Sequence, residues 1–188
     1  MQQVSFKLQR KDEPMSKTIV IHGHRHPSQS VFGKALFESA TALPSVTGHT
    51  LIEVYPDYKI DGENERALLA AHANIVLQFP LYWYSSPAIV KEWLDEVLSR
   101  GWAYGGGQAL AGKKLMLAVT TGGPEQVYQH GGANRFTIQE FLRPLEQTAA
   151  LCGMQWQTPF VMFGVRYLDD QMIKQHGLNY QNRIQNLL

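Results

Sequence analysis

The run Ala73-Asn-Ile-Val-Leu-Gln-Phe79, stopped by Pro80, decides the fold of this chain. Its apolar residues follow one another without the polar alternation of a half-exposed strand, which is typical of a strand buried on both faces of a parallel sheet. Pro80 ends the run because its nitrogen has no hydrogen to donate to a neighbouring strand. Glu63–His72 before the run and Pro87–Ser99 after it have helical composition and spacing, so we expect a helix on each side of this strand.

The same alternation of short apolar runs and helical segments continues in both directions along the chain. We expect the other strands at Thr18–His22, His49–Tyr55, Lys114–Thr121 and Gln155–Val165. The other helices are expected at Val31–Ala42, Phe136–Cys152 and Asp169–Leu188, with a kink or a break at Pro144. Five strands, each followed by a helix, predict an α/β fold: a three-layer sandwich around a five-stranded parallel sheet in the order 2-1-3-4-5.

Length and the N-terminal segment indicate one folded unit. A chain of 188 residues fits one domain and is long enough to bury a core without disulfides or a structural metal. Residues 1–16 are polar, carry both charge signs and lack the apolar run of a signal peptide. We therefore expect a flexible leader over residues 1–16, in which Met15 is an alternative start, and one domain over residues 17–188.

Charge and cysteine content exclude several classes of function. A formal net charge of +1 gives no strong field for attracting nucleic acid. Cys152 is the only cysteine, so one chain holds no internal disulfide and no cysteine-rich zinc or iron–sulfur site. Its apolar neighbours predict a buried, unreactive thiol in preference to a catalytic nucleophile. This pattern is typical of a protein of the reducing cytoplasm.

The first loop of interest is His22–Ser30. Ligands of an open parallel sheet bind beyond the carboxyl ends of its strands, where the strand order reverses, so the loops after strands one, three and four are informative. Hydroxyls of Ser28 and Ser30 beside free amides at a helix N-terminus favour a phosphate group, although Ser30 alone also suits a simple N-cap. His22, His24 and His26 alternate as metal ligands on a strand would, but Arg25 and Pro27 interrupt them and no carboxylate or thiolate follows closely. We predict no metal site.

The second and third loops carry aromatic side chains and glycines. Phe79–Pro87 is rich in aromatic residues, which either pack on a partner or on the core, or stack against a planar ligand. Thr120–Tyr128 contains glycines that let backbone amides approach a ligand edge, and Tyr128 offers a hydroxyl, although Gly-Gly-Pro also suits a plain turn. Three such loops on one sheet edge together favour a single cofactor site.

Several motifs resemble those of the flavodoxin-like NAD(P)H:quinone oxidoreductases. They are Phe79–Tyr84, Pro87–Asp95, Gly101–Tyr104, Leu110–Lys113 and Thr120–Gly123. Within that family the ancillary oxidoreductases of glutathione-regulated potassium-efflux systems are the most similar subgroup, to which Asn134–Phe136 and Leu142–Pro144 through Thr148–Ala150 also correspond. The likeness runs from about Ile19 to Phe160.

The resemblance implies a cofactor and its site. FMN, with FAD as the alternative, would place its phosphate and ribityl end at His24 and at Ser30, Val31, Phe32 and Gly33. Leu81, Tyr82, Trp83 and Tyr84 would line the isoalloxazine ring, and Thr120, Thr121, Gly122 and Gly123 would hold its pyrimidine side. Tyr128 matches a tyrosine near the flavin, and His130 lies close to the family's catalytic histidine without aligning cleanly. Gly33 stands where the family usually has an asparagine.

The resemblance also implies an activity and partners. With NAD(P)H as co-substrate, the enzyme would reduce quinones or similar electrophilic acceptors by two-electron ping-pong transfer, as a homodimer. The alternatives are a flavin-loaded regulatory subunit of a membrane potassium-efflux transporter, and an electron carrier like flavodoxin, for which the near-neutral charge is less suitable. The expected location is the cytoplasm, with a peripheral position at the inner face of the cell membrane as the alternative.

Overall fold

The computed structural model describes residues 17–188, so the expected leader over residues 1–16 lies outside the described residues. Its sheet is built from β1 (Thr18–His22), β2 (Val46–Thr50), β3 (Asn74–Pro80), β4 (Lys114–Thr120), β5 (Gln155–Trp156) and β6 (Phe160–Met162). All pairs are parallel in the order β2-β1-β3-β4-β5, and β6 also pairs with β4. The predicted flavodoxin-like α/β fold and sheet order are confirmed.

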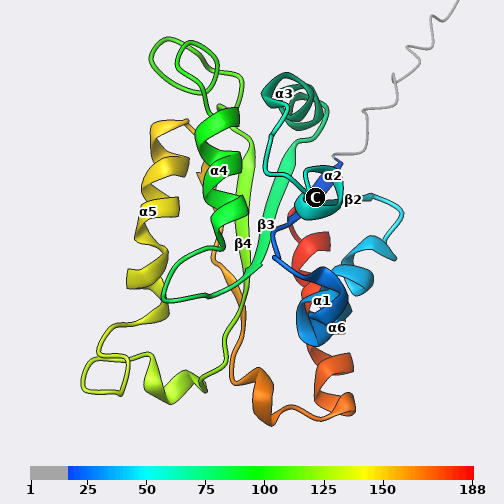
Figure 1. Ribbon diagram of the computed structural model, residues 1–188, viewed down its shortest axis with the longest axis vertical. Coiled ribbons are helices and arrows are strands. Elements are labelled where there is room, and N and C mark those ends of the chain that lie inside the picture. The colour runs from blue at the N-terminus through cyan, green and yellow to red at the C-terminus, as the bar shows by residue number, and fades with distance from the viewer. Residues whose placement is uncertain (1–16) are drawn as a thin grey trace, which may run out of the picture.

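Helices cover both faces of this sheet (Figure 1). One face carries α1 (Val31–Thr41) and α6 (Asp170–Gln185), and the other carries α3 (Gly62–Ala70), α4 (Ala88–Val97) and α5 (Ile138–Leu151). Successive strand residues enter different layers: Ile19 and Ile21 pack in the cluster under α4 and α5, whereas Val20 packs with Leu36 and Tyr180 under α1 and α6. Burial on both faces explains the continuous apolar runs of the sequence. None of the helices described in residues 17–188 has the length and apolar character to cross a bilayer.

The expected bounds of the second strand, His49–Tyr55, were wrong. Strand β2 begins earlier and pairs residue by residue with β1, and the chain then turns into α2 (Leu51–Val54). Leu51 is fully buried at the start of that helical turn, so its apolar character reflects the core and not the strand. Glycine is a weak strand former, so the expected strand began only after Gly48. A Cβ at Gly48 would lie 2.6 Å from Cγ2 of Thr41, so the close approach of β2 to α1 requires glycine.

The expected fifth strand, Gln155–Val165, is split into β5 and β6. Pro159 lies in the gap between them and has no amide hydrogen for the β4 ladder. Residues beyond Met162 leave the sheet and form the short 3-10 helix η3 (Val165–Tyr167), which places them near the loops of interest. A kink or a break was expected at Pro144, and the break does not occur, because α5 continues through this residue as one helix.

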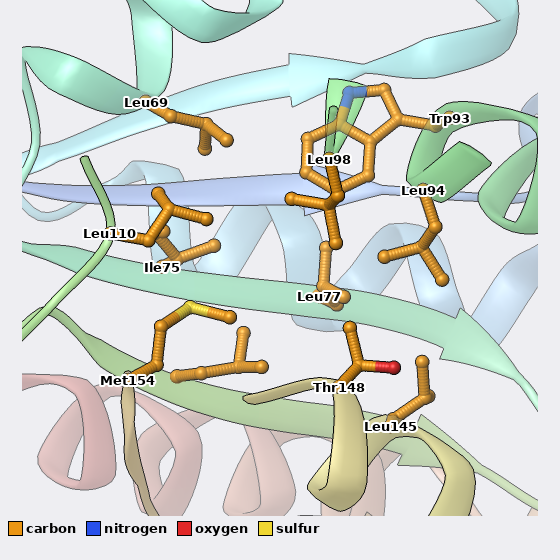
Figure 2. A pocket seen from close by; sticks show the side chains of 11 residues that line it. Leu69, Ile75, Leu77, Trp93, Leu94, Leu98, Leu110, Leu145, Thr148 and Met154 are labelled. Carbon is orange, nitrogen blue, oxygen red and sulfur yellow. The ribbon is translucent and has the colours of Figure 1, made fainter. Parts of the chain in front are cut away.

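The apolar core under α4 and α5 contains a small cavity of about 10 Å³ (Figure 2). The side chains of Leu77, Trp93, Leu98, Leu110 and Met154 are among those that converge on it from the sheet, the helices and a loop. This volume is about that of one water-sized probe, and the lining is almost wholly apolar. The cavity is a packing defect of the core and no binding site for an organic cofactor.

A buried carboxylate lies in the same half of the molecule. Glu65 of α3 has no exposed surface and accepts hydrogen bonds from three donors: Nε2 of His49 at 2.9 Å, the hydroxyl of Tyr55 at 2.7 Å and Nε1 of Trp93 at 2.7 Å. Burial would raise the pKa of this carboxyl, but the donors from His49, Trp93 and Tyr55 outweigh it and lower the pKa below its ordinary 4.5. Glu65 thereby ties β2, α2, α3 and α4 together.

Candidate functional site

The three informative loops meet at the carboxyl edge of the sheet. The amide of Gly23 donates to the carbonyl of Gln78 at 2.9 Å, and the amide of Leu81 donates to the carbonyl of Thr120 at 2.9 Å. These bonds join the loop after β1 to β3, and the loop after β3 to the end of β4. As predicted, topology brings the loops together although they are far apart in the sequence.

Two adjoining pockets lie between these loops. The inner pocket, of about 280 Å³, is lined by His24, Gln29, Ser30, Val31, Phe32, Gly33, Pro80, Leu81, Tyr82, Thr120, Thr121, Gly122, Val165 and Arg166. The outer pocket, of about 490 Å³, is lined by Leu81, Trp83, Tyr84, Gly122, Gly123, Pro124, Val127, Tyr128, Ala133, Asn134, Arg166 and Tyr167. They share Leu81, Gly122 and Arg166, so an elongated ligand can extend from one pocket into the other.

The inner pocket ends at the N-terminus of α1. The amides of Val31, Phe32 and Gly33 donate to no acceptor within residues 17–188, as expected of the first turn of a helix. Ser30 precedes the helix, but its side chain makes no capping hydrogen bond, so the simple N-cap role considered for it is not realised. Free amides and the positive end of the helix dipole suit an anionic group such as phosphate.

Gly33 is held in place by a side chain of β3. Nε2 of Gln78 donates to the carbonyl of Gly33 at 2.7 Å, and both residues are buried. A Cβ at Gly33 would lie 2.5 Å from the hydroxyl oxygen of Ser30 and 3.4 Å from Nε2 of His22. An asparagine here, as the resemblance suggests for relatives, would force the Ser30 hydroxyl to turn away. In this chain the loop is fixed by Gln78.

His24 links the first loop to the aromatic loop. Its Nδ1 accepts the amide hydrogen of His26 at 2.9 Å, and its Nε2 lies 2.8 Å from the hydroxyl of Tyr82. Burial lowers the pKa of His24, which favours the neutral ring. Because Nδ1 accepts, the neutral ring carries its hydrogen on Nε2 and donates it to the Tyr82 oxygen. The hydroxyl hydrogen of Tyr82 is then free to donate into the inner pocket.

His22 lies beneath the same loop. It is 2 % exposed, its ring stacks on Phe37, and its Nε2 has no hydrogen-bond partner among residues 17–188. Burial, and secondarily the neighbouring His24, lower the pKa of His22 from 6.5 to about 4. The ring is therefore neutral in the folded protein at pH 7 and must be protonated when the protein unfolds in mild acid.

This depressed pKa predicts an acid-dependent loss of stability. A histidine whose pKa is lower in the folded state favours folding above pH 6.5, and this contribution is lost as the pH falls from 6.5 to about 4. The shift corresponds to ~3 kcal/mol in the free energy of unfolding. Urea unfolding of the wild type and of His22→Phe at pH 7, 6, 5 and 4.5 measures it. We expect a clearly flatter pH profile for the variant, and parallel profiles would contradict the assignment to His22.

The aromatic loop makes a tight turn with an unusual backbone. Tyr82 and Ser85 exchange both backbone hydrogen bonds at 3.0 Å, so Trp83 and Tyr84 form the two central positions. Their φ angles of 49° and 65° lie in the left-handed region, which large residues rarely adopt. Trp83 is also 93 % exposed. Backbone strain together with an uncovered indole indicates a surface shaped for binding.

The third loop presents two free amides to the outer pocket. The hydroxyl of Thr121 donates to the carbonyl of Gly123 at 2.8 Å, and the amide of Thr121 donates to the carbonyl of Met162 at 3.0 Å. The amides of Gly122 and Gly123 donate to no acceptor within residues 17–188. The ring of Tyr128 packs edge-on against Phe141, and its hydroxyl lies beside Gly123. The loop thus leaves two backbone donors available at the outer pocket.

The expected site residues are divided between the two pockets, and one of them lies outside both. Tyr82 lines the inner pocket beside His24 and not the outer pocket with Trp83 and Tyr84. His130 lines neither pocket: its side chain is 74 % exposed and lies 3.5 Å from Glu140 in the first turn of α5. Within residues 17–188 no group of three or more potential ligands is placed to hold a metal ion.

Arg166 and Tyr167 were missed by the sequence analysis. They line the outer pocket from η3, and Arg166 lines the inner pocket as well. The sequence offered no signal for them, because the fifth strand was expected to run to Val165 and because a single arginine beyond a strand has no motif.

Comparison with known proteins agrees with this fold. The family described as flavodoxin-like fold matches residues 16–184. The glutathione-regulated potassium-efflux system ancillary protein KefG of Cronobacter sakazakii is 45 % identical over 167 residues, which cover 88 % of this chain and 91 % of that protein. General stress protein 14 of Treponema denticola, solved in complex with FMN, has a TM-score of 0.86 and 37 % identity over 92 % of this chain and 99 % of that one.

A further solved structure, described as an NADPH-quinone reductase from P. pentosaceus, has a TM-score of 0.82 and 32 % identity over 89 % of this chain and 96 % of that chain. The resemblance drawn from the motifs is confirmed, because the family match and the relatives cover almost the same residues as the sheet and its helices. The chain belongs to the flavodoxin-like fold family, in which its relatives include the KefG ancillary proteins of glutathione-regulated potassium-efflux systems.

Proposed function

We propose that this protein is an FMN-dependent oxidoreductase that uses NAD(P)H to reduce quinones or similar electrophilic acceptors. The observation that carries the proposal is the pair of adjoining pockets with unpaired backbone donors at both ends: Val31–Gly33 at the inner end, and Gly122 and Gly123 along the outer pocket. The inner donors suit the phosphate of FMN, and the outer donors suit the carbonyl and nitrogen acceptors of its pyrimidine ring. The relatives described as FMN-bound and as a quinone reductase support this assignment.

Some of the pocket side chains would hold the cofactor, and others would shape the acceptor site. When bound, FMN would supply the redox chemistry, a two-electron transfer from NAD(P)H to the acceptor. His24 holds Tyr82 so that its hydroxyl donates into the inner pocket. Trp83 and Tyr84 offer exposed aromatic surface at the outer pocket, on which planar substrates would stack. Tyr128 donates a hydroxyl hydrogen at the pyrimidine side.

The proposal is tested on the purified protein. We expect a yellow protein with flavin absorption, one FMN per chain after release and phosphorus counting, and steady oxidation of NAD(P)H when a quinone is added. Parallel double-reciprocal lines would support ping-pong transfer. A protein that remains colourless and takes up neither FMN nor FAD would overturn the proposal, and a loaded protein that NAD(P)H cannot reduce would be an electron carrier instead.

Replacing Tyr128 by phenylalanine should slow flavin reduction by NAD(P)H by about 10- to 100-fold while leaving FMN bound. The ring would keep its packing against Phe141 and Phe163, and only the hydroxyl beside Gly123 would be lost. One hydrogen bond to a developing charge is worth on the order of 1.5–3 kcal/mol. Stopped-flow reduction at saturating NADPH measures the effect, and His130→Ala is the matched comparison. Unchanged reduction in Tyr128→Phe would remove this residue from the mechanism.

A second candidate function is regulation of a potassium-efflux transporter by a flavin-loaded subunit. The relative at 45 % identity is described as an ancillary protein of such a system, and this description favours the candidate. The two functions are compatible, because one flavoprotein can be both enzyme and subunit. Co-purification of the tagged protein with a potassium-efflux transporter expressed beside it would support the candidate. Transport unaffected by the protein in reconstituted vesicles would count against it.

We also propose that the protein works as a homodimer. Trp83, Tyr84 and Tyr167 line the outer pocket and leave large apolar areas uncovered, and Phe136, which packs on Phe141 as Tyr84 does, is exposed as well. Exposed aromatic side chains of this size are usually covered by a ligand or a partner. Sedimentation of the FMN-loaded protein measures the assembly, and a monomer at micromolar concentration would contradict it.

A further inference from the structure

Arg166 is the one side chain with a permanent charge among those that line the two pockets. Both linings include neutral polar and apolar residues, but no lysine, aspartate or glutamate. His24, the histidine of the inner pocket, has a lowered pKa because it is buried. Arg166 is exposed and forms no ion pair or side-chain hydrogen bond with any residue of 17–188. A cation without a counter-charge therefore lies at the junction of the pockets.

The position of Arg166 assigns it to one end of the site. Its Nε lies 3.4 Å, and its Cζ 3.7 Å, from where a Cβ on Gly122 would stand, so the guanidinium packs directly over that glycine. Gly122 contributes one of the free amides of the third loop. Val31–Gly33, whose amides are free, line the inner pocket alone, whereas Arg166 and Gly122 line both pockets. Arg166 thus lies beside the Gly122 amide, one of the donors proposed for the pyrimidine edge of the flavin.

We propose that Arg166 balances the negative charge that the pyrimidine edge of the flavin gains on reduction, and so raises the midpoint potential of the bound cofactor. This inference rests on the proposed function. Hydride transfer from NAD(P)H to flavin N5 delivers two electrons and one proton, the oxidised nicotinamide leaves, and the reduced flavin keeps one additional negative charge at its N1 and O2 edge. A fixed cation at that edge stabilises the reduced form more than the oxidised form, because only the reduced form carries that charge.

The test compares the affinity of the protein for FMN in its two redox states. In Arg166→Gln, binding of reduced FMN should weaken about tenfold more than binding of oxidised FMN, which for a two-electron couple corresponds to a midpoint potential lower by about 30 mV. Arg166→Lys should stay close to the wild type because it keeps the charge. Lys174→Gln, which removes an exposed charge on α6 away from both pockets, is the matched control and should change nothing.

The other outcomes are distinguishable. If both redox states of FMN lose affinity equally, Arg166 serves the phosphate, and the inference is overturned. If FMN binding and potential are unchanged while NADPH binds more weakly, Arg166 contacts the nicotinamide nucleotide, and the inference is again overturned. A wild type that takes up no FMN would refute the proposed function itself. Circular dichroism of each variant verifies that the fold is intact.

Discussion

Replacing Ser30 by aspartate should weaken FMN binding by about 100-fold or more while leaving the protein at least as stable as the wild type. Aspartate is a good N-cap and places a negative charge at the positive end of α1, so the free protein gains or keeps stability. The same carboxylate would stand beside the free amides of Val31–Gly33, where the phosphate of FMN is proposed to bind. Repulsion between two anions about 4–5 Å apart near a protein surface costs at least ~3 kcal/mol, which corresponds to the stated loss in affinity.

Two comparisons make the Ser30→Asp experiment specific. Riboflavin has the same ring and ribityl chain but no phosphate, so its affinity for Ser30→Asp should be close to its affinity for the wild type. The wild type should bind FMN more tightly than riboflavin, and Ser30→Asp should not. Ser28→Asp is the matched variant, because Ser28 is exposed in the same loop and does not line the inner pocket. Fluorescence titration of the wild-type and variant apoproteins with FMN and with riboflavin measures the six affinities. Equal losses for FMN and riboflavin would show that the phosphate does not bind at the start of α1.

Replacing Glu65 by leucine should lower the free energy of unfolding by about 3–5 kcal/mol. The substitution removes the acceptor for the buried hydroxyl of Tyr55, for Nε1 of Trp93 and for Nε2 of His49. A buried donor without a partner costs ~1–3 kcal/mol, and breaking a buried charged network costs ~3–5 kcal/mol. Domains of this size are stable by only ~5–15 kcal/mol, so the variant would lose a large share of its stability. Urea unfolding followed by circular dichroism measures the loss.

The acid dependence of the Glu65 contribution provides an independent control. A carboxyl whose pKa is lowered in the folded state stabilises the fold above its ordinary pKa of 4.5, and this contribution is lost as the pH falls below that value. The stability difference between the wild type and Glu65→Gln should therefore shrink below pH 4.5. Glu63→Gln, an exposed change on the same helix, should alter stability by less than ~0.5 kcal/mol. A Glu65→Leu variant as stable as Glu63→Gln would contradict the structural role of this carboxylate.

The sequence predicted which loops form the candidate site, because that part of the site follows from the topology of the sheet. Buried parallel strands produce continuous apolar runs, and a doubly wound sheet places the loops after β1, β3 and β4 at one edge. Ser30, Trp83 and Gly122 could therefore be assigned to a common site before their contacts were known. Cys152 was likewise expected to be an inert core residue, and it is buried with a pKa raised by that burial.

The expected bounds of the second strand were wrong because the local sequence pattern did not reflect the packing against distant residues. Gly48 was left outside the expected strand, but it belongs to β2, where Thr41 and Phe37 of α1 lie against it and leave no room for a Cβ. Leu51 looked like a strand residue, but it is the buried start of α2. In both cases the identity of the residue was set by a neighbour from another part of the chain.

The sequence by itself determined the layered α/β fold, the strand order and the loops that form the site, because the period of apolar residues and the rules of parallel connection are local properties of the chain. The tertiary structure alone decided that Glu65 is buried under three donors, that His22 has no partner for its Nε2, and that Arg166 lies over Gly122. Each of these features depends on contacts between segments that are distant in the sequence. The position of a charged or polar residue in the sequence does not show which neighbours will bury it or whether it will face a pocket.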